Sequence, residues 1–368
     1  MDTILTLTQT IFAFVFVLTI LVFIHEWGHY YVARRYGVRV EVFSIGFGPE
    51  IWGRTDKNGT RWKISAVPLG GYVKFFGDAN SASTPDARIN HLTQEEKDVS
   101  FHYKPLGQRA AIVAAGPMAN FIFAILILAG FFMFIGQPYS PAVVGAVMED
   151  SAASEAGLQV NDKIIAIDGE TVDRFEDIQR LMAINPGKPV ELTLERGAET
   201  LSYRIAPKMV EFEDRHGNVQ RIARIGVARA GAEYIKRDPF SAIWHAVIET
   251  GNIIDASFTG LGQIIVGDRS AKELGGPVKI AKFAGQHAQD GLMALISFMA
   301  MISINLGILN VLPIPMLDGG HLLYYGCEAV LGRKLSDKTQ EFGFKIGLAM
   351  VLALMVFVTV NDIVGLTG

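Results

Sequence analysis

Cysteine and charged side chains are both scarce in this sequence. The single cysteine, Cys327, excludes an intrachain disulfide framework and a zinc site built from a cysteine cluster. Only 19% of the 368 residues are charged, whereas soluble domains typically contain about a quarter. The formal net charge of -4 offers no basic surface, so we expect no nucleic-acid partner. Half of the residues are hydrophobic, which indicates a membrane protein with sizeable polar segments.

Four apolar segments are long enough to cross, or nearly cross, a bilayer with a hydrocarbon core about 30 Å thick. The polar and helix-breaking residues inside them are tolerated where neighbouring helices satisfy the exposed groups. The start of the chain lacks a basic region and an obvious cleavage site, so we expect a retained helix rather than a signal peptide. The sequence therefore predicts a multi-pass α-helical membrane protein. The segments run approximately over residues 4–33, 110–134, 292–312 and 344–360.

Basic residues set the expected orientation. Arg34, Arg35 and Arg39 follow the first apolar segment, whereas only Asp2 precedes it. The positive-inside rule then places the end of the first helix near the cytoplasm. Residues from about 136 to 291 are expected on the outside, which is the periplasm if the protein lies in the inner membrane of a Gram-negative bacterium.

The first apolar segment ends in His25-Glu26-Trp27-Gly28-His29. Histidines four residues apart lie on one face of a helix, so both imidazoles can reach one metal ion, usually zinc. Glu26 is placed to act as the general base of a metalloprotease. A chance match in a surface helix is the alternative. The cost of ionisable groups at the edge of hydrocarbon favours the metal site.

A third zinc ligand is expected near the end of the third apolar segment. Pro313 and Pro315 cannot continue a helix, so the chain breaks there and leaves backbone groups that must be satisfied inside protein or beside water. Asp318 follows the break and precedes two glycines that allow close backbone approach. His321 competes with Asp318 as a ligand, or orients one.

Strand and turn patterns follow the first helix. Asn58-Gly59 suits a tight hairpin turn, because both residues tolerate positive φ angles. Residues 61–67 and 70–76 alternate like strands. The aromatic stretch 71–76 fits either an ordinary small sheet or a strand that dips into the membrane interface. Residues 80–100 are polar without apolar periodicity, and we expect a loop there.

From about residue 142 to residue 207 the composition is that of a soluble domain. The order of its strands and short helices resembles a PDZ domain of the bacterial protease type. The resemblance departs from the usual pattern at Asn161, where glycine is common, although asparagine tolerates the left-handed conformation. A further hairpin with a turn at His216-Gly217-Asn218 is expected after it. The matching residues are Ser154, Ala156-Gly157-Leu158, Asp162-Lys163-Ile164, Ile167-Asp168-Gly169 and Val172.

Together the two motifs resemble the site-2 protease family of intramembrane zinc metalloproteases. The PDZ-like insert is similar to that of its RseP-type group, which cleaves anti-sigma factors, although this chain has one such domain where the best-known member has two. The resemblance implies zinc bound by His25, His29 and Asp318, with Glu26 catalytic. It also implies substrate contacts from Asn310 and from a membrane-reentrant β-loop that pairs with substrate as an added strand. The β-loop residues are Gly70, Gly71, Tyr72, Val73, Lys74 and Phe75.

These patterns divide the chain into eight parts. They are transmembrane helix 1 (1–33), a cytoplasmic-side β region with the reentrant loop (34–107), helix 2 (108–135), a periplasmic PDZ domain (141–208), a periplasmic extension with amphipathic helices (209–290), helix 3 (291–313), the Leu-Asp-Gly segment (314–341) and helix 4 (342–362).

The expected function is zinc-dependent cleavage of the transmembrane segment of a single-pass protein within the lipid bilayer. An anti-sigma factor, cut in a stress response, is the favoured substrate, and clearance of remnant signal peptides needs the same chemistry. A non-catalytic PDZ scaffold is the alternative from another class. It predicts no bound zinc, and buried carboxylates would serve no purpose in it.

Overall fold

The computed structural model describes residues 2–78, 91–183, 185, 187–213, 219–231, 233–267, 270–271 and 274–367. The turn expected at His216-Gly217-Asn218 lies outside these ranges, as does most of the loop expected over residues 80–100. The chain divides into two compact units. The first combines Met1–Ala129 with Ile243–Gly368, and the second is Gly130–Ala242.

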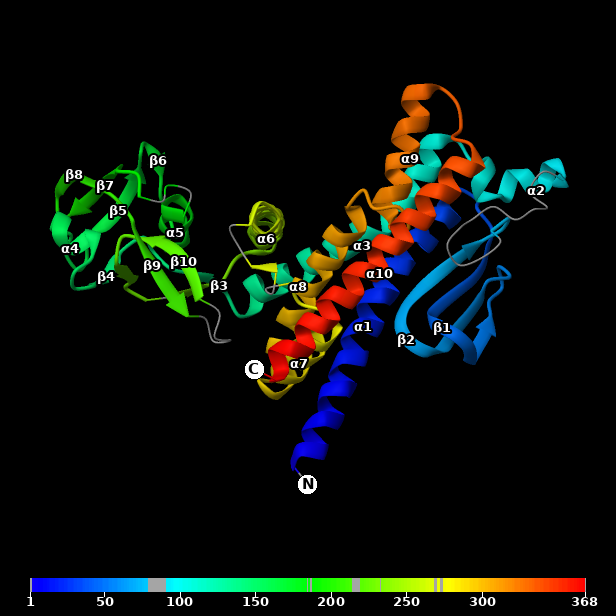
Figure 1. Ribbon diagram of the computed structural model, residues 1–368, viewed down its shortest axis with the longest axis horizontal. Coiled ribbons are helices and arrows are strands. Elements are labelled where there is room, and N and C mark those ends of the chain that lie inside the picture. Colours follow the sequence, from blue (N-terminus) through cyan, green and yellow to red (C-terminus); the bar gives the residue numbers. More distant parts are fainter. Residues whose placement is uncertain are drawn as a thin grey trace. The chain divides into compact units, whose positions relative to one another are not determined.

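Each expected apolar segment forms a helix that is long and apolar enough to cross a membrane (Figure 1). Their interiors are rich in leucine, isoleucine, phenylalanine and alanine, which lets each helix pack against neighbours or face lipid. In α8, 44% of the apolar window is buried, whereas in α10 only 6% is buried. Helix α8 is therefore the most buried of the four. The helices are α1 (Asp2–Arg35), α3 (Leu106–Phe134), α8 (Leu292–Val311) and α10 (Asp337–Thr367).

Further helices lie between them along the chain. In α2 the side chain of Thr93 caps the first turn while Glu96 reaches back to the Thr93 amide, which is a capping box. The expectation of a loop is therefore wrong over Gln94–Val99, because the polar composition concealed a local helix signal. These helices are α2 (Gln94–Val99), η2 (Phe101–Tyr103), α6 (Pro239–Val266), α7 (Pro277–Gln289) and α9 (Asp318–Leu331).

Strands β1 (Val40–Thr55) and β2 (Arg61–Phe75) form one curved sheet beside α1 (Figure 1). Each strand contributes two segments. Residues 42–45 of β1 pair with residues 71–74 on one side and with residues 61–64 on the other, and residues 52–55 pair with 61–64 in turn. The segment 71–75 is therefore an outer edge of this sheet within the described part of the chain.

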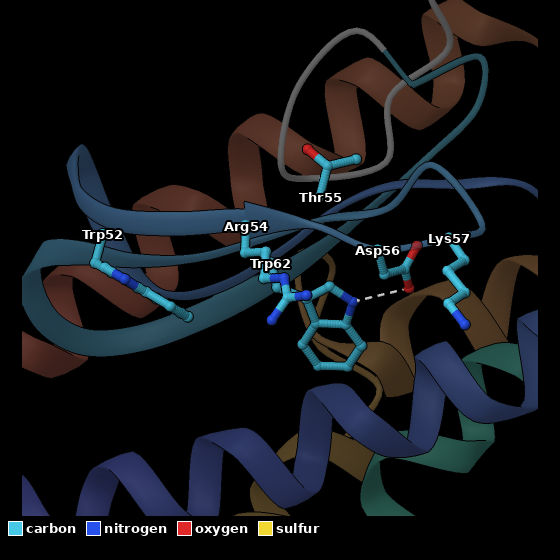
Figure 2. Close-up of a pocket in the computed structure, with 6 residues that line it drawn as sticks. All are labelled: Trp52, Arg54, Thr55, Asp56, Lys57 and Trp62. Atoms are coloured by element: carbon cyan, nitrogen blue, oxygen red, sulfur yellow. Dashed lines mark hydrogen bonds between the residues drawn. The ribbon is translucent and has the colours of Figure 1, made fainter.

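The hairpin turn between β1 and β2 is organised by Asp56. Its carboxylate accepts hydrogen bonds from the amides of Asn58 (2.8 Å) and Thr60 (3.0 Å) and from the Trp62 indole (3.1 Å). Gly59 has φ +82°, as the sequence pattern predicts for a tight turn. Figure 2 shows Asp56 and Trp62 beside a hollow at the turn. The residues that line this hollow do not include any of the expected zinc ligands.

The second unit contains a four-stranded sheet in the order β6-β5-β7-β8 and three two-stranded pairs, β3 with β12, β4 with β11, and β9 with β10. Its core collects the apolar residues that alternate along β5 and β7 and the apolar face of α5, among them Ile164, Leu192 and Ile178. Asn161 has φ +74°, the left-handed conformation that its place in the PDZ-like pattern requires. The strands and helices are β3 (Gln137–Tyr139), β4 (Val144–Val147), α4 (Ala152–Ala156), β5 (Lys163–Ile167), β6 (Glu170–Thr171), α5 (Phe175–Ala183), β7 (Val190–Arg196), β8 (Glu199–Ile205), β9 (Lys208–Glu213), β10 (Val219–Arg224), β11 (Val227–Arg229) and β12 (Glu233–Ile235).

Candidate metal centre

His25 and His29 lie in the last third of α1, and each is only 9% exposed. Helix α3 approaches this part of α1 very closely at Gly116. A Cβ atom there would lie 2.3 Å from Nε2 of His29 and 2.9 Å from Cε1 of His25. On the opposite side, a Cβ atom on Gly28 would lie 2.3 Å from the carbonyl oxygen of Ala115. Glycine at both positions therefore lets the two helices enclose the imidazoles.

Three ligand atoms from two distant segments converge here. Oδ2 of Asp318 lies 3.2 Å from Nε2 of His25 and 3.5 Å from Nε2 of His29. The two Nε2 atoms are themselves 3.2 Å apart. Within the part of the chain that the structure describes, these residues form the one histidine, cysteine and carboxylate group compact enough to hold a metal ion.

The spacing of these atoms fits zinc. Ligands at about 2.0 to 2.1 Å from one tetrahedral ion lie about 3.3 Å from each other, which is close to the separations found here. Oδ2 of Asp318 is also buried, and no hydrogen-bond donor satisfies it among the described residues. A buried carboxylate oxygen that faces two imidazole nitrogens without a donor is explained by a cation between them.

Asp318 reaches the histidines because the chain turns sharply after α8. That helix ends at Val311, and Met316 adopts a φ of +89° in the following turn. A Cβ atom on Gly319 would lie 2.1 Å from the carbonyl oxygen of Val311, and one on Gly320 would lie 2.4 Å from that of Ile314. The two glycines therefore let α9 begin against the end of α8, with Asp318 as its first residue.

His321, the other ligand candidate, does not belong to the metal-binding group, although it lies one turn after Asp318 in α9. Burial lowers the pKa of His321 from its ordinary value. The neutral form is therefore favoured. Among the described residues, Asp318 rather than His321 is therefore grouped with the two imidazoles.

The edge strand of the small sheet lies beside Glu26. The backbone of Val73 lies close enough to the Glu26 carboxylate to interact with it. A Cβ atom on Gly71 would lie 3.2 Å from Cγ of Glu26. Glu26 is 9% exposed and shares the end of α1 with the two histidines. The candidate base, the metal ligands and the edge strand therefore form one continuous site.

The remaining β-loop residues belong to the same sheet and pack against other residues rather than against the metal-binding group. Gly70 has φ +98° and fits against Phe47, and the Tyr72 ring stacks on Phe47 at 6.0 Å between centroids. Lys74 pairs with Glu41 at 3.1 Å, and Phe75 stacks on Phe101 at 5.0 Å. Their side chains support the sheet, so main-chain atoms are what this strand offers to the site.

Asn310 is not brought into contact with the metal ligands. It lies in the last turn of α8, half-buried, and its Nδ2 donates to the carbonyl oxygen of Leu306 at 3.0 Å. The sequence reasoning also missed Asn120 and the carbonyl group of Ile112, which contact the second ring nitrogens of His25 and His29. Asn120 is a polar residue inside an apolar helix, but one helix pattern cannot identify a partner 95 residues away.

Comparison with known proteins agrees with this geometry. A model of peptidase family M50 matches residues 13–354, a span that includes both motifs. The chain belongs to this family. Relatives named "Putative zinc metalloprotease" are 46% identical over 367 residues in Agrobacterium fabrum and 42% identical over 367 residues in Rhizobium meliloti. Each comparison covers 98% of this chain and at least 97% of the relative.

Metalloprotease MmpA from Caulobacter vibrioides is 36% identical over 372 residues, with 95% of this chain and 94% of MmpA covered. A solved PDZ domain of an SdrC-like protein from Listeria monocytogenes is similar over 25% of this chain and 88% of that domain, at 21% identity and a TM-score of 0.20. This M50 peptidase is therefore a zinc metalloprotease with four candidate membrane helices, and the hypothesis of a non-catalytic scaffold is wrong.

Proposed function

We propose that this peptidase cleaves transmembrane segments inside the bilayer, with His25, His29 and Asp318 holding the zinc ion. The convergence of these three ligand atoms beside Glu26, on helices of membrane-spanning length, carries the proposal. Zinc, when bound, polarises a carbonyl oxygen and lowers the pKa of water toward about 7.

Glu26 is the general base in this proposal. Its carboxylate takes a proton from the attacking water as the new C–O bond forms at the scissile carbonyl. The same carboxylic acid then gives the proton to the amide nitrogen as the C–N bond breaks, so the products are a carboxylate and an amine. The burial of Glu26 keeps bulk water away from this transfer.

The substrate must present an extended backbone, because a helix keeps its carbonyl groups in internal hydrogen bonds. The edge strand 71–75 supplies the replacement partners. The Phe76 amide donates inward to the Arg39 carbonyl at 2.9 Å, whereas the Phe75 amide donates to Asp78 at 3.0 Å. Since amide direction alternates along a strand, the amides of Gly71 and Val73 also point away from β1.

An added substrate strand would therefore pair with the outward main-chain groups of Gly71 and Val73, directly beside Glu26. The other β-loop residues, Gly70, Tyr72, Lys74 and Phe75, hold this edge in place. Asn310, at the end of α8, is proposed to turn from Leu306 to the substrate backbone on the other side of the site.

The arginines after α1 support an inner-membrane orientation with the site near the cytoplasm and the PDZ-like unit in the periplasm. We propose a single-pass membrane protein as the substrate, already shortened outside the membrane. The PDZ-like unit would exclude bulky ectodomains or bind the new C-terminus. An anti-sigma factor released in a stress response fits this arrangement, and a remnant signal peptide is the second candidate.

The Glu26→Gln variant tests the catalytic role. It should retain zinc, measured by metal analysis of the purified protein, and lose cleavage of a model transmembrane substrate by at least about 1000-fold. Glu95→Gln on the exposed surface of α2 is the matched control and should cleave normally. Cleavage by Glu26→Gln at the normal rate would remove Glu26 from the mechanism.

A substrate panel tests the substrate class. Anti-sigma-factor segments, remnant signal peptides and unrelated single-pass segments would be compared in detergent and in vesicles. Preference for the first group supports the regulatory role, whereas equal cleavage of signal peptides supports clearance. Failure to cleave any membrane-spanning segment, with soluble peptides still cut, would contradict intramembrane proteolysis.

A further inference from the structure

The two histidines of the metal centre differ in how their second ring nitrogens are held. Nδ1 of His29 lies 2.9 Å from the carbonyl oxygen of Ile112. A carbonyl oxygen only accepts hydrogen bonds, so Nδ1 of His29 carries the proton and Nε2 presents its lone pair to the site. The main chain of α3 therefore fixes the metal-binding tautomer of His29.

At His25, a side chain rather than a main-chain carbonyl group contacts Nδ1. The amide group of Asn120, also on α3, lies with Nδ2 at 3.1 Å from Nδ1 of His25. Asn120 is completely buried, and its Oδ1 has no hydrogen-bond partner among the described residues. A half-turn of the amide group exchanges Oδ1 and Nδ2 without moving the rest of the side chain.

The chemistry of the site requires the exchanged orientation. An amide NH₂ that donates to Nδ1 of His25 would place the imidazole proton on Nε2, and a protonated Nε2 cannot bind zinc. With Oδ1 toward the ring, Nδ1 donates to Asn120 and Nε2 offers its lone pair, 3.2 Å from Oδ2 of Asp318. The same half-turn gives Oδ1 a donor and moves Nδ2 to the place that Oδ1 occupies here.

We infer that Asn120 is a positioning residue that fixes the zinc-binding tautomer of His25 by accepting a hydrogen bond from its Nδ1. The main chain at Asn120 is contacted from a third helix, because the buried Ser303 hydroxyl of α8 donates to the main-chain carbonyl oxygen of Asn120 at 2.8 Å. Helix α8 leads directly into the segment that carries Asp318. Residues of three helices therefore pack together beside the His25 imidazole.

This inference rests on the proposed function in one respect, namely that His25 is a zinc ligand. The full-length protein in detergent is titrated with zinc against a competing chelator, and with Co²⁺ while the visible absorption of the bound ion is recorded. Asn120→Leu removes the acceptor at similar volume and should weaken zinc binding by 10- to 100-fold. Asn120→Asp keeps an acceptor and should bind zinc at least as tightly as the natural protein.

Asn305→Leu on α8 is the matched control, since Asn305 contacts Ser257 rather than the metal centre. It should leave zinc affinity and the Co²⁺ spectrum unchanged. The thermal unfolding of the metal-free variants separates positioning from folding, because positioning alone predicts equal melting of Asn120→Asp and the natural protein without metal. If Asn120→Leu does not fold, the zinc affinity of Asn120→Asp tests the inference.

Normal zinc affinity in Asn120→Leu would overturn the inference, and so would loss of zinc by Asn120→Asp in a folded protein. His25→Ala distinguishes this failure from a failure of the proposed function. If His25→Ala loses zinc while Asn120→Leu retains it, only the role of Asn120 is wrong. If His25→Ala also retains zinc, the proposed ligand set is wrong.

Discussion

Single glycines decide how closely the helices of the metal centre approach each other. Gly116 of α3 faces both imidazoles, and a Cβ atom there would overlap Nε2 of His29 at 2.3 Å. The overlapped atom is one of the proposed ligand atoms, so moving it would take it out of the proposed site. Gly116, which has no side chain, is therefore as important for the proposed metal site as the residues that would bind the ion.

The Gly116→Ala variant should therefore lose zinc. The added methyl group forces α1 and α3 apart or rotates His29, and we expect at least a tenfold loss of zinc affinity with a matching loss of cleavage. Chelator competition measures the affinity. Gly130→Ala on the same helix has no atom within 4 Å of its added Cβ and should bind zinc normally.

Two residues tie α9, which carries Asp318, to α3. The Arg109 guanidinium donates to the Glu328 carboxylate at 2.7 Å, and their side chains are 10% and 5% exposed. Arg109 also stacks on the Tyr325 ring at 4.7 Å. A buried pair of this kind stabilises a specific arrangement because each charge left alone is costly.

At the scale of these helices we predict that Arg109→Met destabilises the protein by about 3 to 5 kcal/mol, since Glu328 is left buried without its partner. Thermal unfolding in detergent measures the change. The double variant Arg109→Met, Glu328→Leu should recover most of the stability. Equal destabilisation by the single and double variants would show that the interaction between Arg109 and Glu328 does not stabilise the protein.

The edge strand gives a second prediction at this scale. Val73→Pro removes the outward amide that faces Glu26 and the added substrate strand, and proline is tolerated where an edge amide points away from the sheet. We expect the variant to fold and to cleave a transmembrane segment at least tenfold more slowly. Val73→Ala keeps the amide and is the control, and its cleavage rate should stay close to normal.

A short unstructured peptide makes this prediction sharper. Such a peptide has no helical hydrogen bonds to replace when it becomes extended. Val73→Pro should therefore slow its cleavage less than that of the transmembrane segment. Equal slowing of both substrates would show that the Val73 amide acts on Glu26 alone and does not pair with substrate.

At the scale of the whole molecule, the PDZ-like unit contains a buried ion pair that makes its stability depend on pH. In the PDZ-like unit, Asp162 is buried and Arg196 donates to both of its carboxylate oxygens at 2.7 Å. Burial alone would raise the pKa of Asp162, but the hydrogen bonds from Arg196 and the Gln159 amide hold that pKa below its ordinary value. The ionised carboxylate therefore stabilises the folded unit.

The direction in which stability changes with pH follows from the difference between the folded and unfolded pKa values of Asp162. A carboxyl group with a lowered pKa in the folded state adds stability above its unfolded pKa of about 3.9, and this stability is lost as the pH falls through the folded pKa. We expect hydrogen-exchange protection of β5 and β7, corrected for intrinsic exchange rates, to fall below about pH 4. Arg196→Met should weaken the protection at pH 7 and flatten this dependence. A natural protein whose protection is unchanged down to pH 2 would contradict the role of Asp162.

The sequence by itself determined the features that depend on local patterns. Continuous apolar runs predicted the four long helices, because burial or lipid contact is the only stable environment for them. The spacing of His25 and His29 predicted a shared face of one helix, and the asparagine-glycine turn and the left-handed Asn161 follow from local backbone preferences. The polar stretch that contains α2 misled the prediction, since a capping box is a two-residue signal.

Only the tertiary structure decided which distant groups meet. The sequence favoured Asp318 over His321 as the third ligand, and the turn after α8 brings Asp318 within 3.5 Å of both imidazoles. Asn120, Gly116 and the outward amide of Val73 gained their roles from contacts between elements far apart in sequence. The physical reason is that helix spacing fixes only the ligands on one turn, whereas a metal centre needs atoms from several elements placed by packing.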